Sequence, residues 1–98
     1  MNNIQIRNYQ PGDFQQLCAI FLRAVTMTAS QHYSPQQIAA WAQIDESRWK
    51  EKLAKSQVRV AVINAQPVGF ITCIGHYIDM LFVEPEYTRR GVASALLK

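Results

Sequence analysis

The chain has 98 residues, of which 49% are hydrophobic and 17% charged, and its formal net charge is +3. This length allows one domain, and the apolar content excludes a disordered chain. No apolar run approaches the roughly 20 residues that span a bilayer. Residues 1–5 also lack the basic and apolar regions of a secretory signal peptide. These features predict a single cytoplasmic domain that makes no membrane contact.

A strand and a helix are predicted first. Apolar and polar residues alternate over residues 4–9, as in a half-buried strand, and Pro11 with Gly12 ends it. Asp13 is a suitable N-cap for a helix that runs to about Ala29. The apolar stripe of this helix recurs at three and four residues and consists of Phe14, Leu17, Cys18, Phe21 and Val25.

Two further helices are expected. Residues 34–37 read Ser-Pro-Gln-Gln, which is a capping box with proline at the first helical position. The inner face of this second helix consists of Ile38, Trp41 and Ala42. Asp45 is expected to cap a third, short helix, in which Trp49 and Leu53 lie four residues apart and face the core.

The second half of the chain predicts an antiparallel meander. From Gln57 the apolar period changes from 3.6 to 2, which is typical of strands. In the first strand the valines 58, 60 and 62 point to one face, and residues 64–67 predict a turn, not of the tight Asn-Gly kind. A second strand alternates through Val68, Phe70, Thr72 and Ile74, and a third covers residues 77–83.

A last helix is predicted over residues 90–98, with Val92 and Leu96 facing inward. The order of strand, two to three helices, three-stranded meander and helix predicts an α+β fold. The chain reaches Lys98 within a predicted helix, and the last strand has an uncovered edge. We therefore expect a domain that is incomplete at its C-terminus, or a partner that finishes the sheet, such as a second copy in a homodimer.

The cysteines and histidines predict neither a disulfide framework nor a metal site. Cys18 and Cys73 lie far apart in apolar-periodic stretches, so both are interpreted as small buried hydrophobic residues. His32 and His76 have no histidine or cysteine at ligand spacing.

The most informative segment is the end of the third meander strand with the helix after it. Free N–H groups at a helix start favour an anion, Gly91 allows close backbone approach, and Arg89 with Arg90 adds positive charge. The Walker and Rossmann glycine patterns are absent. The segment predicts a phosphate or diphosphate site, although an ordinary surface helix cap explains the periodicity equally well.

The same segment resembles motif A of the GNAT family, the acetyl-CoA-dependent N-acetyltransferases. The family pattern, Gln/Arg-x-x-Gly-x-Gly/Ala after a strand that ends apolar-x-Val-x-Pro-Glu-Tyr, is matched over residues 81–93. Thr88 departs from it, because the first motif position is normally Gln or Arg. Residues 61–71 resemble the second hairpin of the family, and residues 4–13 resemble its opening strand and helix.

The resemblance implies a GNAT-like mixed sheet over residues 1–98, with pantetheine beside the fourth strand and a family bulge at Val83. It implies acetyl-CoA as acyl donor and a small-molecule or peptide amine as acceptor. The residues that it assigns to cofactor binding are Leu81, Phe82, Val83, Thr88, Arg89, Arg90, Gly91, Val92, Ala93 and Ser94.

Asp79 is the candidate general base, because it is the carboxylate inside the last strand and could take a proton directly or through water. Alternation places it on one face with Tyr77 and Leu81. A structural role, with a hydrogen bond to neighbouring backbone, stands beside this hypothesis. His76 is a weaker candidate, the glutamates 84 and 86 are expected to cap or solvate the turn, and no general acid is assigned.

Two other functions compete with an N-acetyltransferase. The first is a catalytically incomplete GNAT-like domain that binds coenzyme A or a protein partner. The second is nucleic-acid binding, which the small net charge and its division between two clusters disfavour. The sequence therefore predicts an acetyl-CoA-dependent enzyme that binds no nucleic acid.

Overall fold

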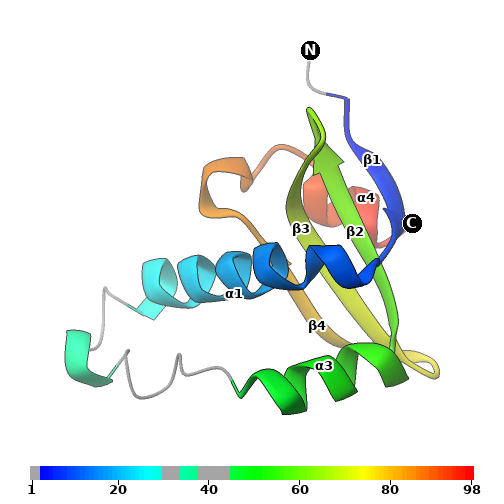
Figure 1. Ribbon diagram of the computed structural model, residues 1–98. Helices are drawn as coiled ribbons and strands as arrows, with labels where there is room; N and C mark the ends of the chain where they lie inside the picture. The colour runs from blue at the N-terminus through cyan, green and yellow to red at the C-terminus, as the bar shows by residue number, and fades with distance from the viewer. Residues whose placement is uncertain (1–2, 30–33, 38–44) are drawn as a thin grey trace.

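The computed structural model describes residues 3–29, 34–37 and 45–98 (Figure 1). Its centre is a four-stranded antiparallel sheet in the order β1-β2-β3-β4. The strands are β1 (Gln5–Asn8), β2 (Gln57–Ile63), β3 (Gln66–Ile74) and β4 (Tyr77–Val83). The predicted α+β class and the antiparallel meander are confirmed.

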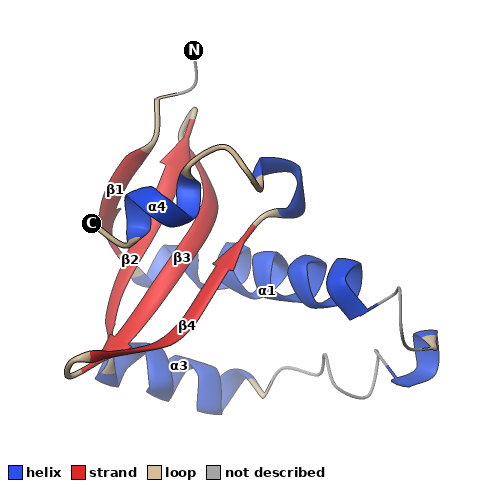
Figure 2. Ribbon diagram, turned by 180° about the vertical axis from the view of Figure 1, so that it is seen from behind, coloured by secondary structure: helices blue, strands red, loops and turns tan. Residues whose placement is uncertain are grey.

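Helices cover both faces of the sheet. Helices α1 (Phe14–Ala29) and α3 (Glu46–Lys55) lie on one face, in front of the strands in Figure 1. Helix α4 (Val92–Leu96) lies on the opposite face, in front of the strands in Figure 2, which is turned by 180° from Figure 1. In the described part of the chain, no helix is long and apolar enough to cross a membrane.

From residue 60 to residue 63, strand β2 is buried on both faces, which explains the continuous apolar sequence there. On the α1/α3 face, Val58 and Val60 pack in one cluster with Leu17 and Phe70. On the α4 face, a second cluster is formed by Ala61, Ile63, Val68, Ile71, Val92 and Leu96. Each fully buried large apolar side chain contributes about 1.5–3 kcal/mol to stability, so the two clusters fix both helical layers on the sheet.

The structure at the start of α1 differs from the prediction for Asp13. Asp13 is not a simple N-cap, because Pro11–Asp13 form a 3-10 turn that runs directly into α1 at Phe14. The Asp13 carboxylate accepts a hydrogen bond from the Gln10 N–H at 2.9 Å and two from the Arg7 guanidinium at 2.7 and 2.8 Å. Asp13 therefore fastens the turn to β1.

The two later helix caps are confirmed. The Ser34 N–H donates to Gln37 Oε1 at 3.0 Å and the Gln37 N–H donates to Ser34 Oγ at 3.2 Å, so residues 35–37 begin a helix. The predicted inner face of that helix (Ile38, Trp41 and Ala42) lies outside the described residues. Asp45 caps α3 by accepting from the Arg48 N–H at 3.2 Å.

The β2–β3 connection is tighter than predicted. It is a two-residue turn, in which Asn64 (φ 52°) and Ala65 (φ 64°) both adopt left-handed conformations and Ile63 pairs with Gln66. The register then shifts, because Val62 pairs with Pro67 and Ala61 with Gly69. The extra residue, Val68, consequently joins the α4-face cluster, so the strict alternation predicted for β3 is wrong at this position.

Candidate functional site

The predicted phosphate-binding residues meet at the corner between β4 and α4. After β4, a 3-10 turn (Pro85–Tyr87) and a short loop lead to α4, which begins at Val92 rather than at the predicted residue 90. Gly91 ends the loop at φ 83°, a left-handed conformation that L side chains rarely adopt, and a Cβ added to it would meet no atom within 4 Å. This backbone is open on the side where a ligand would approach.

Packing beneath the corner fixes its position. Val92 and Leu96 are 1% exposed and contact Gly69 of β3. A Cβ at Gly69 would lie 3.0 Å from Val92 Cγ1 and 3.1 Å from the Phe82 carbonyl oxygen, so any side chain there would force these neighbours to shift. The sheet thus holds the first turn of α4 from below.

The polar groups of the corner suit an anion. Within the described residues, the N–H groups of 92–94 donate to no backbone carbonyl, as expected for the first turn of a helix. Arg89 and Arg90 are exposed, and the Arg90 guanidinium lies 5.5 Å from the centre of the Tyr87 ring. The Thr88 hydroxyl donates to the Pro85 carbonyl at 3.0 Å and so stabilises the preceding turn. The corner therefore offers backbone donors and two cations.

Strand β4 lies at an edge of the sheet among the described strands. Phe82 faces α1, with its ring 5.0 Å from that of Phe21, whereas Leu81 and Val83 pack in the α4-face cluster. Val83 pairs regularly with Gly69, so the bulge that the resemblance implied at Val83 does not occur there. The register shift of β4 is at Asp79 instead, between the pairs Cys73–Ile78 and Thr72–Met80.

The bulge changes the predicted direction of Asp79. Regular alternation would place Asp79 and Leu81 on one face, but the extra residue separates them. Asp79 contacts Lys52 of α3, on the α1/α3 face, whereas Leu81 belongs to the opposite face. Asp79 also lies about 13 Å along the strand from Val83, at about 3.3 Å per residue. The candidate base therefore lies in the middle part of β4, away from the corner that follows the end of the strand.

The Asp79 carboxylate is held by an ion pair. Asp79 Oδ2 lies 2.8 Å from Lys52 Nζ, and 20% of the Asp79 side chain is exposed. Apart from this ion pair, Asp79 Oδ2 has no hydrogen-bond partner among the described residues. The alternative of a hydrogen bond to neighbouring backbone is thus not observed over residues 3–29, 34–37 and 45–98. Thr72 Oγ1, on the adjacent strand, is also buried without a partner there.

Glu84 has a structural partner that the sequence did not indicate. Both carboxylate oxygens of Glu84 accept hydrogen bonds from the Arg23 guanidinium of α1. These hydrogen bonds raise the pKa of Arg23 above its ordinary value. The expectation that Glu84 only caps or solvates the turn is therefore wrong, because it joins the end of β4 to α1. Sequence reasoning missed the pair because 61 residues separate its members.

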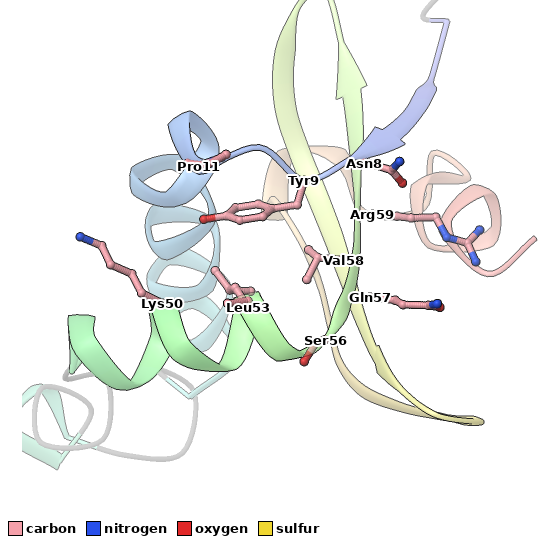
Figure 3. A pocket seen from close by; sticks show the side chains of 10 residues that line it. Asn8, Tyr9, Pro11, Lys50, Leu53, Ser56, Gln57, Val58 and Arg59 are labelled. Atoms are coloured by element: carbon pink, nitrogen blue, oxygen red, sulfur yellow. The ribbon is translucent and has the colours of Figure 1, made fainter.

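Two hollows flank these elements. One, of about 460 Å³, lies between α1 and the turn after β4 and is lined by Leu22, Arg23, Thr26, Met27, Glu84, Pro85 and Glu86. The other, of about 880 Å³, lies beside β1, β2 and α3, where Tyr9, Leu53 and Val58 point toward one another (Figure 3). The second hollow contains none of the predicted site residues. Burial raises the pKa of its Tyr9 hydroxyl.

The two cysteines are less buried than the sequence predicted. Cys18 and Cys73 are free thiols and are partly rather than fully buried, each packed beside one of the two clusters. Burial raises the pKa of the Cys18 thiol. Over the described ranges, no three histidine, cysteine, aspartate or glutamate side chains gather as metal ligands would. His76 lies exposed in the turn between β3 and β4.

Comparison with known proteins gives consistent matches. The family described as the acetyltransferase (GNAT) domain matches residues 29–98. An uncharacterized N-acetyltransferase, YafP of Escherichia coli K12, is 92% identical over all 98 residues of the chain. The chain covers 65% of that protein, which is just under two thirds of its length.

Solved structures share the fold. A GCN5-related N-acetyltransferase from Rhodopseudomonas palustris superimposes with a TM-score of 0.87 at 33% identity, over 99% of this chain and 62% of that one. The PaiA N-acetyltransferase of Thermoplasma acidophilum, in complex with coenzyme A, superimposes with a TM-score of 0.83 at 20% identity. That match covers 97% of this chain and 67% of the other chain, and it supports the fold alone.

Proposed function

Because the chain belongs to the GNAT acetyltransferase family, we propose that it binds acetyl-CoA as the acyl donor of an N-acetyltransferase. Residues 1–98 form part of a single domain of this kind. The observation that carries the proposal is the corner at Gly91, where unpaired N–H groups and two arginines lie beside the edge strand β4. The acceptor is an amine of a small molecule or a peptide.

The corner is proposed to hold the diphosphate of coenzyme A. Residues 88–94 would supply backbone N–H donors, and Arg89 with Arg90 would supply charge. The outer edge of β4, at Leu81, Phe82 and Val83, would bind the amide groups of pantetheine through its backbone, because a strand edge presents unpaired N–H and C=O groups. The Thermoplasma protein, which shares the fold, is in complex with coenzyme A.

The reaction proposed is direct acyl transfer. The amine nitrogen attacks the thioester carbonyl carbon, a C–N bond forms and the C–S bond breaks. One proton leaves the nitrogen, for which Asp79 is the proposed acceptor, and one proton is taken up by the departing sulfur to give the thiol of coenzyme A. The products are the N-acetylated amine and coenzyme A.

Binding is tested by thermal unfolding with coenzyme A. At one hundred times the dissociation constant, the ligand should add about 2.7 kcal/mol to stability. Gly91→Asp should lose most of this effect, because a carboxylate near the diphosphate costs about 3–4 kcal/mol at an effective dielectric constant near 20.

The matched control is Gly91→Asn, which imposes the same left-handed strain without charge, so it should bind at least about 10-fold more tightly than Gly91→Asp. Equal binding by the two variants would show that the diphosphate lies elsewhere. Mass spectrometry of an amine panel incubated with acetyl-CoA then separates acyl transfer from binding of coenzyme A alone.

A further inference from the structure

Asp79 is held in place by a helix that is distant in sequence. The bulge turns Asp79 toward the α1/α3 face, where Lys52 Nζ approaches Oδ2 to 2.8 Å. The neighbouring strand β3 does not hold the carboxylate, since Asp79 Oδ2 accepts no hydrogen bond from the described residues and Thr72 Oγ1 is not bonded to it. Among the described groups, Lys52 is therefore the contact that sets where the carboxylate lies.

Helix α3 carries a second ion pair of a different kind. Lys55 pairs with Glu51 at 2.6 Å, one turn earlier on the same helix, and both side chains are more than half exposed. Such a pair joins the helix only to itself and contributes little. Lys52, in contrast, joins α3 to β4. Leu53 and Trp49 pack the same helix on the sheet, so the Lys52 ammonium is carried on a fixed element.

We propose that Lys52 is a positioning residue for Asp79, which aims the carboxylate at the amine whose proton it removes. This inference rests on the proposed function, in particular on Asp79 as proton acceptor. The physical reason is that the bulge interrupts the ladder and re-aims Asp79, so that Lys52 fixes where the carboxylate lies, and proton transfer requires hydrogen-bond distance. A small misplacement of a catalytic group lowers the rate strongly.

The test compares the unaltered protein with Lys52→Met, Lys52→Arg and Lys55→Met. Each is incubated with acetyl-CoA and a panel of an alkylamine, an amino acid and a short peptide with a free N-terminus. The acetylated product is quantified by mass spectrometry, and coenzyme A binding and melting temperature are measured in parallel. We expect Lys52→Met to lower kcat by about 10-fold or more with the KM for acetyl-CoA unchanged. Lys52→Arg should restore most of the rate, and Lys55→Met should remain within about twofold.

Each other outcome has a defined meaning. A kcat for Lys52→Met within about twofold of the unaltered protein rejects the role of Lys52 and leaves the proposed function intact. A loss that follows a lower melting temperature and is not restored by arginine also rejects it, because Lys52 would then be only structural. If the unaltered protein acetylates none of the amines, acyl transfer itself is overturned, and the role of Lys52 with it.

Discussion

Asp13 and Asp79 each form an ion pair with a side chain from another element, and their surroundings differ. Asp13 accepts hydrogen bonds on both oxygens from Arg7 and a third bond from the Gln10 N–H, and its side chain is 9% exposed. Asp79 pairs with Lys52 at 2.8 Å, Oδ2 has no hydrogen-bond partner among the described residues, and its side chain is 20% exposed. Both oxygens of the Asp13 carboxylate accept hydrogen bonds within the fold, whereas the Asp79 carboxylate can still accept further hydrogen bonds.

The difference indicates which carboxylate stabilises the fold and which is available for chemistry. A carboxylate with hydrogen bonds to both oxygens stabilises the fold, because protein hydrogen bonds replace the contacts with water that are lost on folding. A carboxylate that keeps free acceptor positions can still accept a proton from a substrate amine. The difference also has a local cause, since six residues separate Arg7 from Asp13, whereas a bulge and a distant helix place Asp79.

The largest expected effect is on the rate of acetylation, for which Asp79 is the aspartate that matters. Asp79→Asn should lower kcat for acetylation by about 100-fold or more, because the amide cannot accept the amine proton. Coenzyme A binding and melting temperature should change little. Comparable kcat values for Asp79→Asn and the unaltered protein, with an amine that mass spectrometry shows to be acetylated, would remove Asp79 as the base.

The second effect is on stability. Asp13→Asn should lower the free energy of unfolding by about 2 kcal/mol, because it leaves the Arg7 guanidinium without its bidentate partner. Coenzyme A binding by the folded fraction should not change. Denaturant unfolding at neutral pH measures the loss. A loss of binding at a temperature where the variant is folded would contradict the structural role of Asp13.

The same pair predicts a pH dependence of stability. The Arg7 guanidinium holds the pKa of the Asp13 carboxyl below its ordinary value. The contribution of the Arg7–Asp13 pair to the free energy of unfolding is therefore complete above the pKa of an unfolded aspartate, about 3.9. It is lost as the pH falls through the lower pKa that Asp13 has in the folded protein. Urea unfolding from pH 6 down to pH 3 should show a smaller decline for Asp13→Asn than for the unaltered protein. Parallel curves would mean that the pair does not contribute.

The smallest effect concerns the neighbour of Asp79. Thr72 is fully buried, and its hydroxyl has no hydrogen-bond partner in the part of the chain that the structure describes. Thr72→Val replaces this hydroxyl by a methyl group of similar size. We expect the free energy of unfolding to stay the same or to rise by up to about 1 kcal/mol. A loss of about 1 kcal/mol would instead show that this hydroxyl makes a hydrogen bond. Thr72→Ser, which keeps the hydroxyl, is the matched control.

Several features were predicted from the sequence because they depend on neighbours along the chain. The caps at Ser34 and Asp45 are confirmed, since a cap and the N–H groups that it binds lie within three residues. The predicted inward-facing positions of Val92 and Leu96 are also confirmed, because the helical period of apolar residues is likewise a local pattern. The cofactor-binding assignment of residues 81–83 and 88–94 stays a prediction.

The sequence by itself determined the α+β class, the meander and the corner at Gly91, because hydrophobic period, capping residues and glycine act over a few residues. Only the tertiary structure decided the two-residue turn, the shifted face of Val68, the bulge at Asp79, and the partners Arg23 and Lys52. Strand register and ion pairs between elements depend on how layers pack across tens of residues. A local sequence pattern does not predict how these layers pack. The position of the candidate base therefore depends on the whole folded chain.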